Sequence, residues 1–179
     1  MTDFTLHTQD SAPQEAQPLL ENSIKSFGMI PNLHAVMAES PQTLSAYQHI
    51  HQQVLSNSLT AEEKTVVWQS INVEHQCHYC VPAHSMIAKS MGVDAAINQA
   101  LRDRTPLPTE KLEVLRDTTL ALVKQRGVID QTALDTFFAA GYERRQLLDI
   151  LLVLSQKVLS NYVNHLADTP LDEAFKPFA

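Results

Sequence analysis

The stretch that decides the fold spans residues 74–84 and reads Glu74-His75-Gln76-Cys77-His78-Tyr79-Cys80-Val81-Pro82-Ala83-His84. Two cysteines and a histidine follow one another in it at intervals of three and four residues. In an α-helix these intervals place side chains on one face. We therefore expect one helix over residues 77–91, with Cys77 in its first turn and Cys80 and His84 in the same column.

The expected column contains the elements of a reactive thiol site. Unpaired backbone N–H groups and the positive dipole end of a helix N-terminus stabilise a thiolate, and a nearby imidazole can take the thiol proton. Both effects lower the cysteine pKa from its ordinary value of about 8.5. The thiolate is the nucleophile, and a second cysteine one turn away converts a sulfenic acid into a disulfide. The spacing predicts redox function for the pair.

Two other interpretations of the pair stay open. Free cysteines are commonly buried as small apolar residues. The Cys-x-x-Cys-x-x-x-His pattern also supplies three metal ligands, and His75, His78 or a lone histidine such as His51 would be the fourth. Structural zinc usually takes its other ligands from a second, distant pair, and the chain has only 2 cysteines. We therefore expect no metal at this site.

Other residues near the pair are candidates for the same site. Glu74 precedes the first cysteine by three residues on an otherwise apolar helical stripe, where a carboxylate is costly without a partner. It is a candidate base or proton relay, or else a solvated residue at a frayed helix end. His78 and Tyr79 lie between the cysteines and can line the site. His51 lies on the apolar face of another helix, where most histidines are satisfied core residues.

Helix start and stop signals recur along the whole chain. Thr60 to Glu63 form a capping box. Other expected helix starts are at Pro18, Ser40-Pro41, Asp94, Thr109 and Asp130, and the expected helix ends are at Gly28, Gly92, Gly127 and Gly141. No stretch shows the sustained alternation of a strand. We expect an all-α, single compact domain over residues 1–179, with seven to nine helices after a loose lead-in at 1–15. The last helix, at about 143–166, is apolar on nearly every side over 147–154, which favours a central position or a subunit interface.

The composition excludes several classes of function. The 179 residues carry a net charge of −7, with lysines and arginines scattered, so we expect no nucleic-acid binding. The first 14 residues lack the pattern of a signal peptide, and the longest apolar run is too short to span a bilayer. We expect a cytoplasmic protein without a membrane segment. In that reducing compartment we do not expect a close cysteine pair to form a structural disulfide.

The same segments resemble a known family. Residues 74–84, after the Leu59-Thr60-Ala61-Glu62-Glu63 helix start, resemble the alkylhydroperoxidase D-like proteins of the carboxymuconolactone decarboxylase superfamily. Residues 27–33, Phe27-Gly28-Met29-Ile30-Pro31-Asn32-Leu33, are similar to a stretch of the peroxidase-related branch of that family. The two matches cover about residues 20–95.

The resemblance implies an all-helical fold, assembly into dimers, trimers or hexamers, and thiol-dependent peroxidase activity. It implies that Cys80 attacks the peroxide, that Cys77 resolves the product and that His84 belongs to a proton relay. The chain departs from the family in two places. Tyr79 stands where the best-known members have a histidine, and Thr65 stands where they have a glutamate. Glu74 or, less readily, Glu63 would have to replace that glutamate.

The leading hypothesis is therefore a hydroperoxide reductase that is reduced by an outside dithiol or protein electron donor. No glycine-rich nucleotide-binding pattern is present, and we expect no organic cofactor. A carboxymuconolactone decarboxylase-type enzyme is an alternative that rests on the superfamily alone. A redox sensor or a metal-binding protein is the non-enzymatic alternative.

Overall fold

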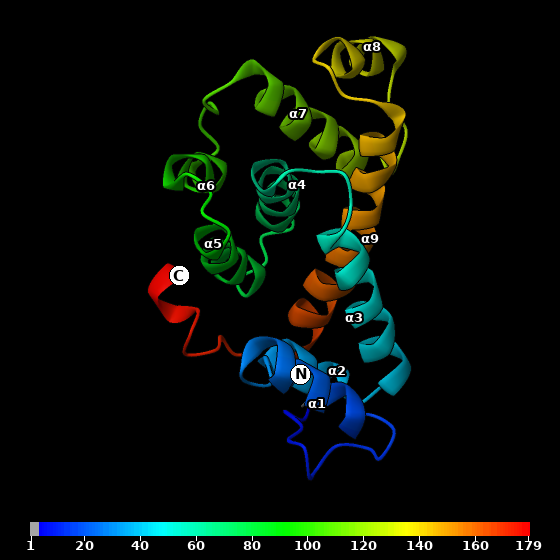
Figure 1. The fold of residues 1–179 in the computed structure, drawn as a ribbon, viewed down its shortest axis with the longest axis vertical. Helices are drawn as coiled ribbons and strands as arrows, with labels where there is room; N and C mark the ends of the chain where they lie inside the picture. Colours follow the sequence, from blue (N-terminus) through cyan, green and yellow to red (C-terminus); the bar gives the residue numbers. More distant parts are fainter. Residues whose placement is uncertain (1–3) are drawn as a thin grey trace.

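The structure, a computed structural model, describes residues 4–179 and is helical throughout that range, without a strand (Figure 1). The helices are α1 (Gln17–Phe27), α2 (Asn32–Met37), α3 (Pro41–Leu55), α4 (Ala61–Glu74), α5 (Cys80–Ser90), α6 (Ala95–Asp103), α7 (Glu110–Lys124), α8 (Gln131–Ala139), α9 (Arg144–Ala167) and the 3-10 helix η1 (Lys176–Phe178). The predicted all-α class is confirmed.

Local capping signals account for most helix boundaries. At the start of α4, Thr60 accepts the backbone N–H of Glu63, and the Glu63 carboxylate accepts the N–H of Thr60, as the capping box predicted. Asp130 accepts the N–H of Ala133 at the start of α8. Gly28 ends α1 with a φ of 74°, a left-handed conformation that glycine adopts without steric cost.

The prediction that α5 begins at Cys77 is wrong, because the helix begins at Cys80. Gln76 has a φ of 53°, which turns the chain sharply after α4. Cys77 lies in the connection that follows, although its carbonyl already accepts the N–H of Val81. Cys80 therefore occupies the first position of the helix and Cys77 precedes it.

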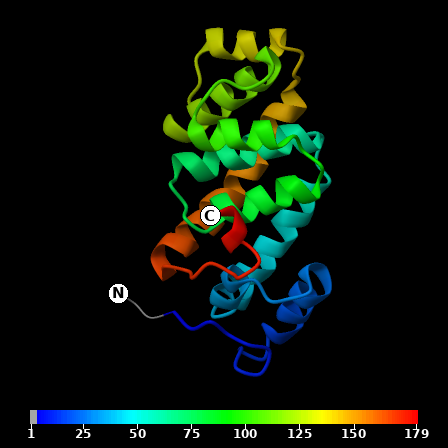
Figure 2. The same cartoon turned by 90° about the vertical axis from the view of Figure 1, so that its left-hand side faces the viewer.

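Helix α4 lies in the middle of the bundle and packs against α5, α6, α7 and α9 (Figure 1). The longest helix, α9, runs along one side with α3 beside it, and α1 and α2 lie at one end of the molecule. Figure 2 shows α8 at the opposite end. Two cores result: one surrounds Trp68, and the other contains Leu20, Leu44 and both cysteines. The cysteine pair thus lies inside the molecule, where α5 faces α9 and α2.

The two terminal segments pack against this second core. Residues 4–16, which we expected to be part of a loose lead-in, contribute buried Ala12 and Ala16, and the His7 N–H bonds the Ala35 carbonyl; residues 1–3 lie outside the described range. The segment after α9 crosses to α5, against which η1 packs (Figure 2). No helix in residues 4–179 combines the length and apolarity needed to cross a membrane.

Candidate active site

Both cysteines are free thiols enclosed in the interior. Cys77 is 0% and Cys80 is 2% exposed. The backbone N–H of Cys80 donates to the Cys77 sulfur over 3.3 Å, so the two residues form one compact turn. Cys80 faces a cavity, whereas Cys77 is not among the residues that line it. The two thiols therefore differ in their access to a small molecule.

The cavity has a volume of about 280 Å³ and is bounded by the α1–α2 connection, α3, α5, α9 and the C-terminal segment. Most of its surface is apolar or aromatic. Its lining residues are Phe27, Met29, Pro31, Leu33, His34, Tyr47, His51, Tyr79, Cys80, Ala83, His84, Met86, Ile87, Lys157, Ala174 and Phe175. Small-molecule sites commonly combine such apolar walls with a few placed polar groups.

Helix α9 supplies a buried polar stripe that the sequence analysis missed. Lys157, Ser160, Asn161 and Asn164 are all fully buried and lie on one helical face. The Asn164 amide Nδ2 donates to the Cys80 sulfur over 3.3 Å, and Ser160 Oγ lies 3.9 Å from it. The sequence carried a signal for this stripe: over residues 157–164, polar residues recur at helical spacing between apolar ones.

These contacts separate the two thiols in acidity. The hydrogen bond that the Cys77 thiol shares with Cys80, and then burial, raise the pKa of Cys77. Burial alone would also raise the pKa of Cys80, but the hydrogen bond from Cys77 and the positive charge of Lys157 outweigh it and lower this pKa to about 5. Cys80 is therefore the thiolate at neutral pH.

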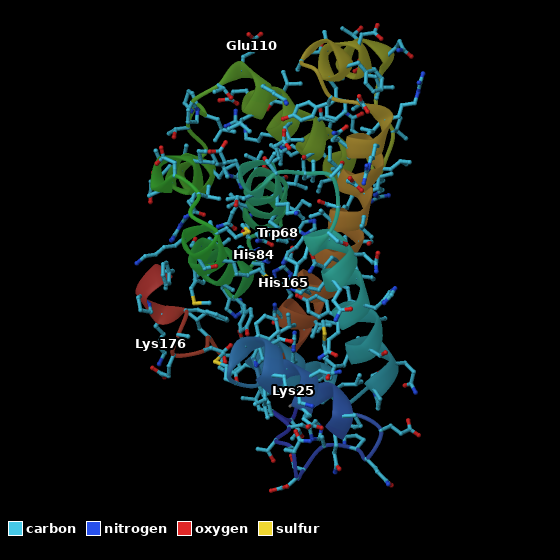
Figure 3. All side chains as sticks on the ribbon, viewed as in Figure 1. Lys25, Trp68, His84, Glu110, His165 and Lys176 are labelled. Atoms are coloured by element: carbon cyan, nitrogen blue, oxygen red, sulfur yellow. The ribbon has the colours of Figure 1, made fainter. Side chains whose placement is uncertain are left out.

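His84 lies on the same helix as Cys80, and its hydrogen bond is to Lys157 and not to a cysteine. The Lys157 ammonium Nζ donates to His84 Nε2 over 2.9 Å, and the imidazole packs against the Trp68 ring at 4.8 Å between centroids (Figure 3). Burial, and then the charge of Lys157, hold the pKa of His84 well below its ordinary value. The ring is neutral, and its Nε2 lone pair is occupied by the lysine.

The other two histidines on the cavity wall, His34 and His51, flank the Tyr47 ring. The centroid distances from Tyr47 are 5.5 Å to His34 and 6.3 Å to His51. Burial is the main cause that lowers the pKa of His34 to about 3 and that of His51 to about 4. Both are therefore neutral near pH 7. His51 was a sequence candidate, whereas His34 was not.

Tyr79 lies on the cavity wall and His78 points away from it. The Tyr79 hydroxyl donates to Asp172, accepts the Leu33 N–H over 3.3 Å, and its ring meets Phe175 edge to face at 5.6 Å. His78 Nε2 lies 3.0 Å from the Thr169 carbonyl oxygen. The two residues between the cysteines therefore fasten the C-terminal segment over the cysteine turn.

The structure does not bring Glu74 to the cysteines. Its carboxylate lies 3.5 Å from Lys124 Nζ and 3.9 Å from Arg104 Nη1, in a separate depression between α4, α6 and α7. Glu63 belongs to the capping box, and Thr65 Oγ1 donates to the Ala61 carbonyl. No carboxylate lines the cavity in the part of the chain that the structure describes.

Metal coordination was the other chemical interpretation of the cysteine motif. Over residues 4–179, no group of three or more histidine, cysteine, aspartate or glutamate side chains is placed to hold a metal ion. The His84 nitrogen that faces α9 is bonded to Lys157, which is a cation. The motif and its surroundings therefore present thiols beside an ammonium group.

Comparisons with known proteins identify the fold. Neither a protein-family model nor a curated protein matches the sequence. An uncharacterized peroxidase-related protein with an alkylhydroperoxidase AhpD core, from Ralstonia eutropha JMP134, superimposes with a TM-score of 0.84 at 16% identity, over 98% of this chain and 96% of that one. A peroxidase-related protein from Silicibacter sp. TM1040 gives 0.80 at 18% identity, with the same coverage.

A third similar structure is the debrominase Bmp8. Its apo form superimposes with a TM-score of 0.82 at 18% identity, over 99% of this chain and 96% of that one. A cysteine-to-alanine variant of Bmp8 has been solved in complex with 2,3,4-tribromopyrrole. The expected fold is thus confirmed over nearly the whole chain: this protein has the AhpD-like fold of these peroxidase-related structures.

Proposed function

We propose that the chain is a thiol-dependent hydroperoxide reductase in which Cys80 is the attacking thiolate and Cys77 the resolving thiol. One observation carries the proposal: Cys80 faces the cavity beside the buried cation of Lys157, while Cys77 lies directly behind it, outside the cavity. A nucleophile must meet the substrate, and a resolving thiol needs only to meet the nucleophile.

The first step transfers oxygen from the substrate to sulfur. The Cys80 thiolate attacks the terminal oxygen of ROOH, the O–O bond breaks, and the products are Cys80–SOH and RO⁻, which takes up a proton to give ROH. Sulfur is oxidised and the peroxide is reduced by two electrons. The Lys157 ammonium stabilises the thiolate before attack, and because it lines the same cavity as Cys80, its charge can also stabilise the alkoxide that forms.

The second step forms the disulfide. The Cys77 sulfur attacks the sulfur of Cys80–SOH, the S–O bond breaks, and hydroxide leaves with the Cys77 proton as water. An outside dithiol then reduces the Cys77–Cys80 disulfide and becomes a disulfide itself. The complete cycle converts ROOH and one dithiol to ROH, water and one oxidised donor.

Thiol titration with one equivalent of cumene hydroperoxide tests the proposal. We expect both thiols to disappear and the intact mass to fall by two hydrogens, with no bound zinc in a parallel metal analysis. Cys77→Ser should leave a sulfenic acid that a dimedone-type probe traps on Cys80, and Cys80→Ser should consume no peroxide. Two unreactive thiols with one zinc per chain would instead support the metal site.

Reductive dehalogenation of a small aromatic halide is a second candidate function. The aromatic residues Phe27, Tyr47 and Phe175 line the cavity with Cys80, and one similar structure is a debrominase that was solved with a brominated pyrrole. In this reaction an aryl bromide and two thiols give the arene, a disulfide and HBr, so two electrons again leave the thiols. Bromide release from a polybrominated pyrrole, with loss of both thiols, would favour this function over peroxide reduction.

A further inference from the structure

The histidines of the cavity wall differ in what they offer a bound molecule, and neighbouring side chains determine the difference. A neutral imidazole has one N–H donor and one bare acceptor nitrogen, and the partner of one nitrogen settles the state of the other. His34, His51 and His84 all line the cavity, and each has one ring nitrogen with a named partner. The tautomers of His51 and His84 can therefore be derived, because their partners can only donate.

A short chain of hydrogen bonds fixes the tautomer of His51. The Trp68 indole Nε1–H can only donate, and it donates to Gln156 Oε1 over 2.9 Å. This contact fixes the orientation of the Gln156 amide, so its Nε2–H₂ group is the side that faces His51. The amide nitrogen lies 2.7 Å from His51 Nδ1, which must therefore accept. The ring proton of neutral His51 is on Nε2.

The orientation of the His51 ring is held from two sides. Tyr47 stacks on it with an interplanar angle of 16°, and Phe27 packs against it at 6.2 Å between centroids. Nε2 has no hydrogen-bond partner within residues 4–179, and the residue lines the cavity that contains Cys80. The Nε2–H group is thus an oriented donor without an acceptor.

The other two histidines differ from His51 in their contacts. The one hydroxyl hydrogen of Ser23 can go to the Leu19 carbonyl at 3.1 Å or to His34 Nδ1 at 2.8 Å, so these contacts do not fix the tautomer of His34. His84 accepts from Lys157 at Nε2, and its Nδ1 is fully buried and unpaired. His51 is therefore the cavity histidine whose contacts fix a ring N–H that stays open to a bound molecule.

We propose that His51 is a substrate-binding residue whose Nε2–H donates a hydrogen bond to an oxygen of the molecule held against Cys80, and that Gln156 and Trp68 are positioning residues that keep the proton on that nitrogen. The proposal deepens the hydroperoxide reductase function and rests on it. The substrate class is an apolar body that carries a compact oxygen head, because most of the wall is apolar or aromatic and its polar groups are few. A neutral imidazole N–H can stabilise a developing oxyanion without giving up its proton.

The tautomer is tested first, without any substrate. ¹⁵N NMR at pH 7 distinguishes protonated from bare ring nitrogens, and we expect His51 to be protonated on Nε2 alone. Trp68→Phe removes the indole donor but keeps an aromatic ring, so the Gln156 amide is free to turn and both tautomers of His51 should appear. A parent His51 ring that is protonated on Nδ1, or on both nitrogens, would overturn the proposal.

Binding is tested with 2-phenyl-2-propanol, the alcohol product of cumene hydroperoxide, which has no O–O bond to react. We expect its addition to shift the His51 Nε2 resonance and to leave His49, an exposed histidine on the same helix, unchanged. A saturating titration that moves neither resonance, although the alcohol binds by calorimetry, would show that the oxygen does not meet His51.

Turnover supplies the third readout. His51→Phe keeps the ring packing and loses the donor, and it should raise KM for cumene hydroperoxide about fivefold to tenfold, the worth of one hydrogen bond. His51→Gln returns an N–H and should restore most of this loss, while His49→Gln should match the parent. The alkylation rate of Cys80 should stay unchanged in all of them, because the thiolate does not depend on His51.

The outcomes separate the two proposals. A parent protein that never reduces hydroperoxides, yet shifts His51 Nε2 on binding the alcohol, removes the proposed function and leaves the His51 donor in place. A parent protein that reduces hydroperoxides, with KM unchanged in folded His51→Phe, keeps the function and overturns the donor.

Discussion

Replacing Lys157 with methionine should raise the pKa of Cys80 and move the whole pH profile of thiol reactivity upward. Lys157 is 0% exposed, its ammonium is bonded to His84 at 2.9 Å, and its charge is one of the causes that lower the Cys80 pKa. Methionine fills similar space without charge. An opposite charge within about 4–6 Å lowers the pKa of an acid by about 1 to 3, so we expect a rise of that size.

The consequence at neutral pH follows from the thiolate fraction. With the pKa of Cys80 at about 5, nearly all of it is thiolate at pH 7. A rise of about 3 would leave roughly a tenth of it as thiolate. The thiolate becomes intrinsically more nucleophilic as its pKa rises, which offsets part of the lost rate. The midpoint of the rate–pH curve is therefore a sharper measure than the rate at one pH.

The assay is the alkylation rate of Cys80 by iodoacetamide between pH 4 and 10, followed by intact mass in a Cys77→Ser background. Lys89→Met, on the exposed side of the same helix as Cys80, is the matched control and should leave the midpoint in place. A Lys157→Met midpoint that coincides with the parent midpoint, in a folded variant, would refute the electrostatic role. The variant is expected to fold, because Cys80 takes up a proton once the lysine charge is gone, so that no unpaired charge stays buried.

Three further predictions concern residues around the site. Glu74→Gln should leave hydroperoxide turnover unchanged, because the carboxylate faces Lys124 and not the cysteines. A large loss of kcat would show instead that Glu74 takes part in proton transfer. Tyr79→Phe should lose the bond to Asp172, weaken the hold on the C-terminal segment by about 1–2 kcal/mol and speed amide exchange over residues 169–178; equal exchange would contradict this. Acid should destabilise the fold, because the three cavity histidines have lowered folded pKa values: their stabilisation is complete above the unfolded pKa of about 6.5 and is lost as pH falls, at up to about 4 kcal/mol per pH unit. Equal urea unfolding free energies at pH 7 and pH 5 would contradict that prediction, which concerns His34, His51 and His84.

Sequence patterns predicted the helices well because the signals that end a helix are local. Thr60 and Glu63 cap each other across three residues, and Gly28 adopts a left-handed conformation where α1 stops. The exception is the start of α5. The left-handed backbone of Gln76 is a non-glycine turn without a residue signature, so the spacing of the cysteines was mistaken for continuous helix.

The site could be predicted only in part. The positions of Cys80 and His84 on one helix follow from spacing alone. Glu74 also followed a helical stripe, but that stripe leaves the core at the end of α4, where Arg104 and Lys124 meet the carboxylate. A helical pattern shows which residues share a face, and it does not show which element that face contacts.

The sequence by itself determined the all-helical architecture, most helix ends and the closeness of the two cysteines, because each depends on interactions between residues a few positions apart. Only the tertiary structure brought Lys157 and Asn164 to sulfur atoms about eighty residues away in the chain, and linked Trp68, Gln156 and His51 into one hydrogen-bond chain. These contacts depend on how α9 packs against α3, α4 and α5. That packing is settled by the burial of apolar surface over the whole domain, and no local signal encodes it.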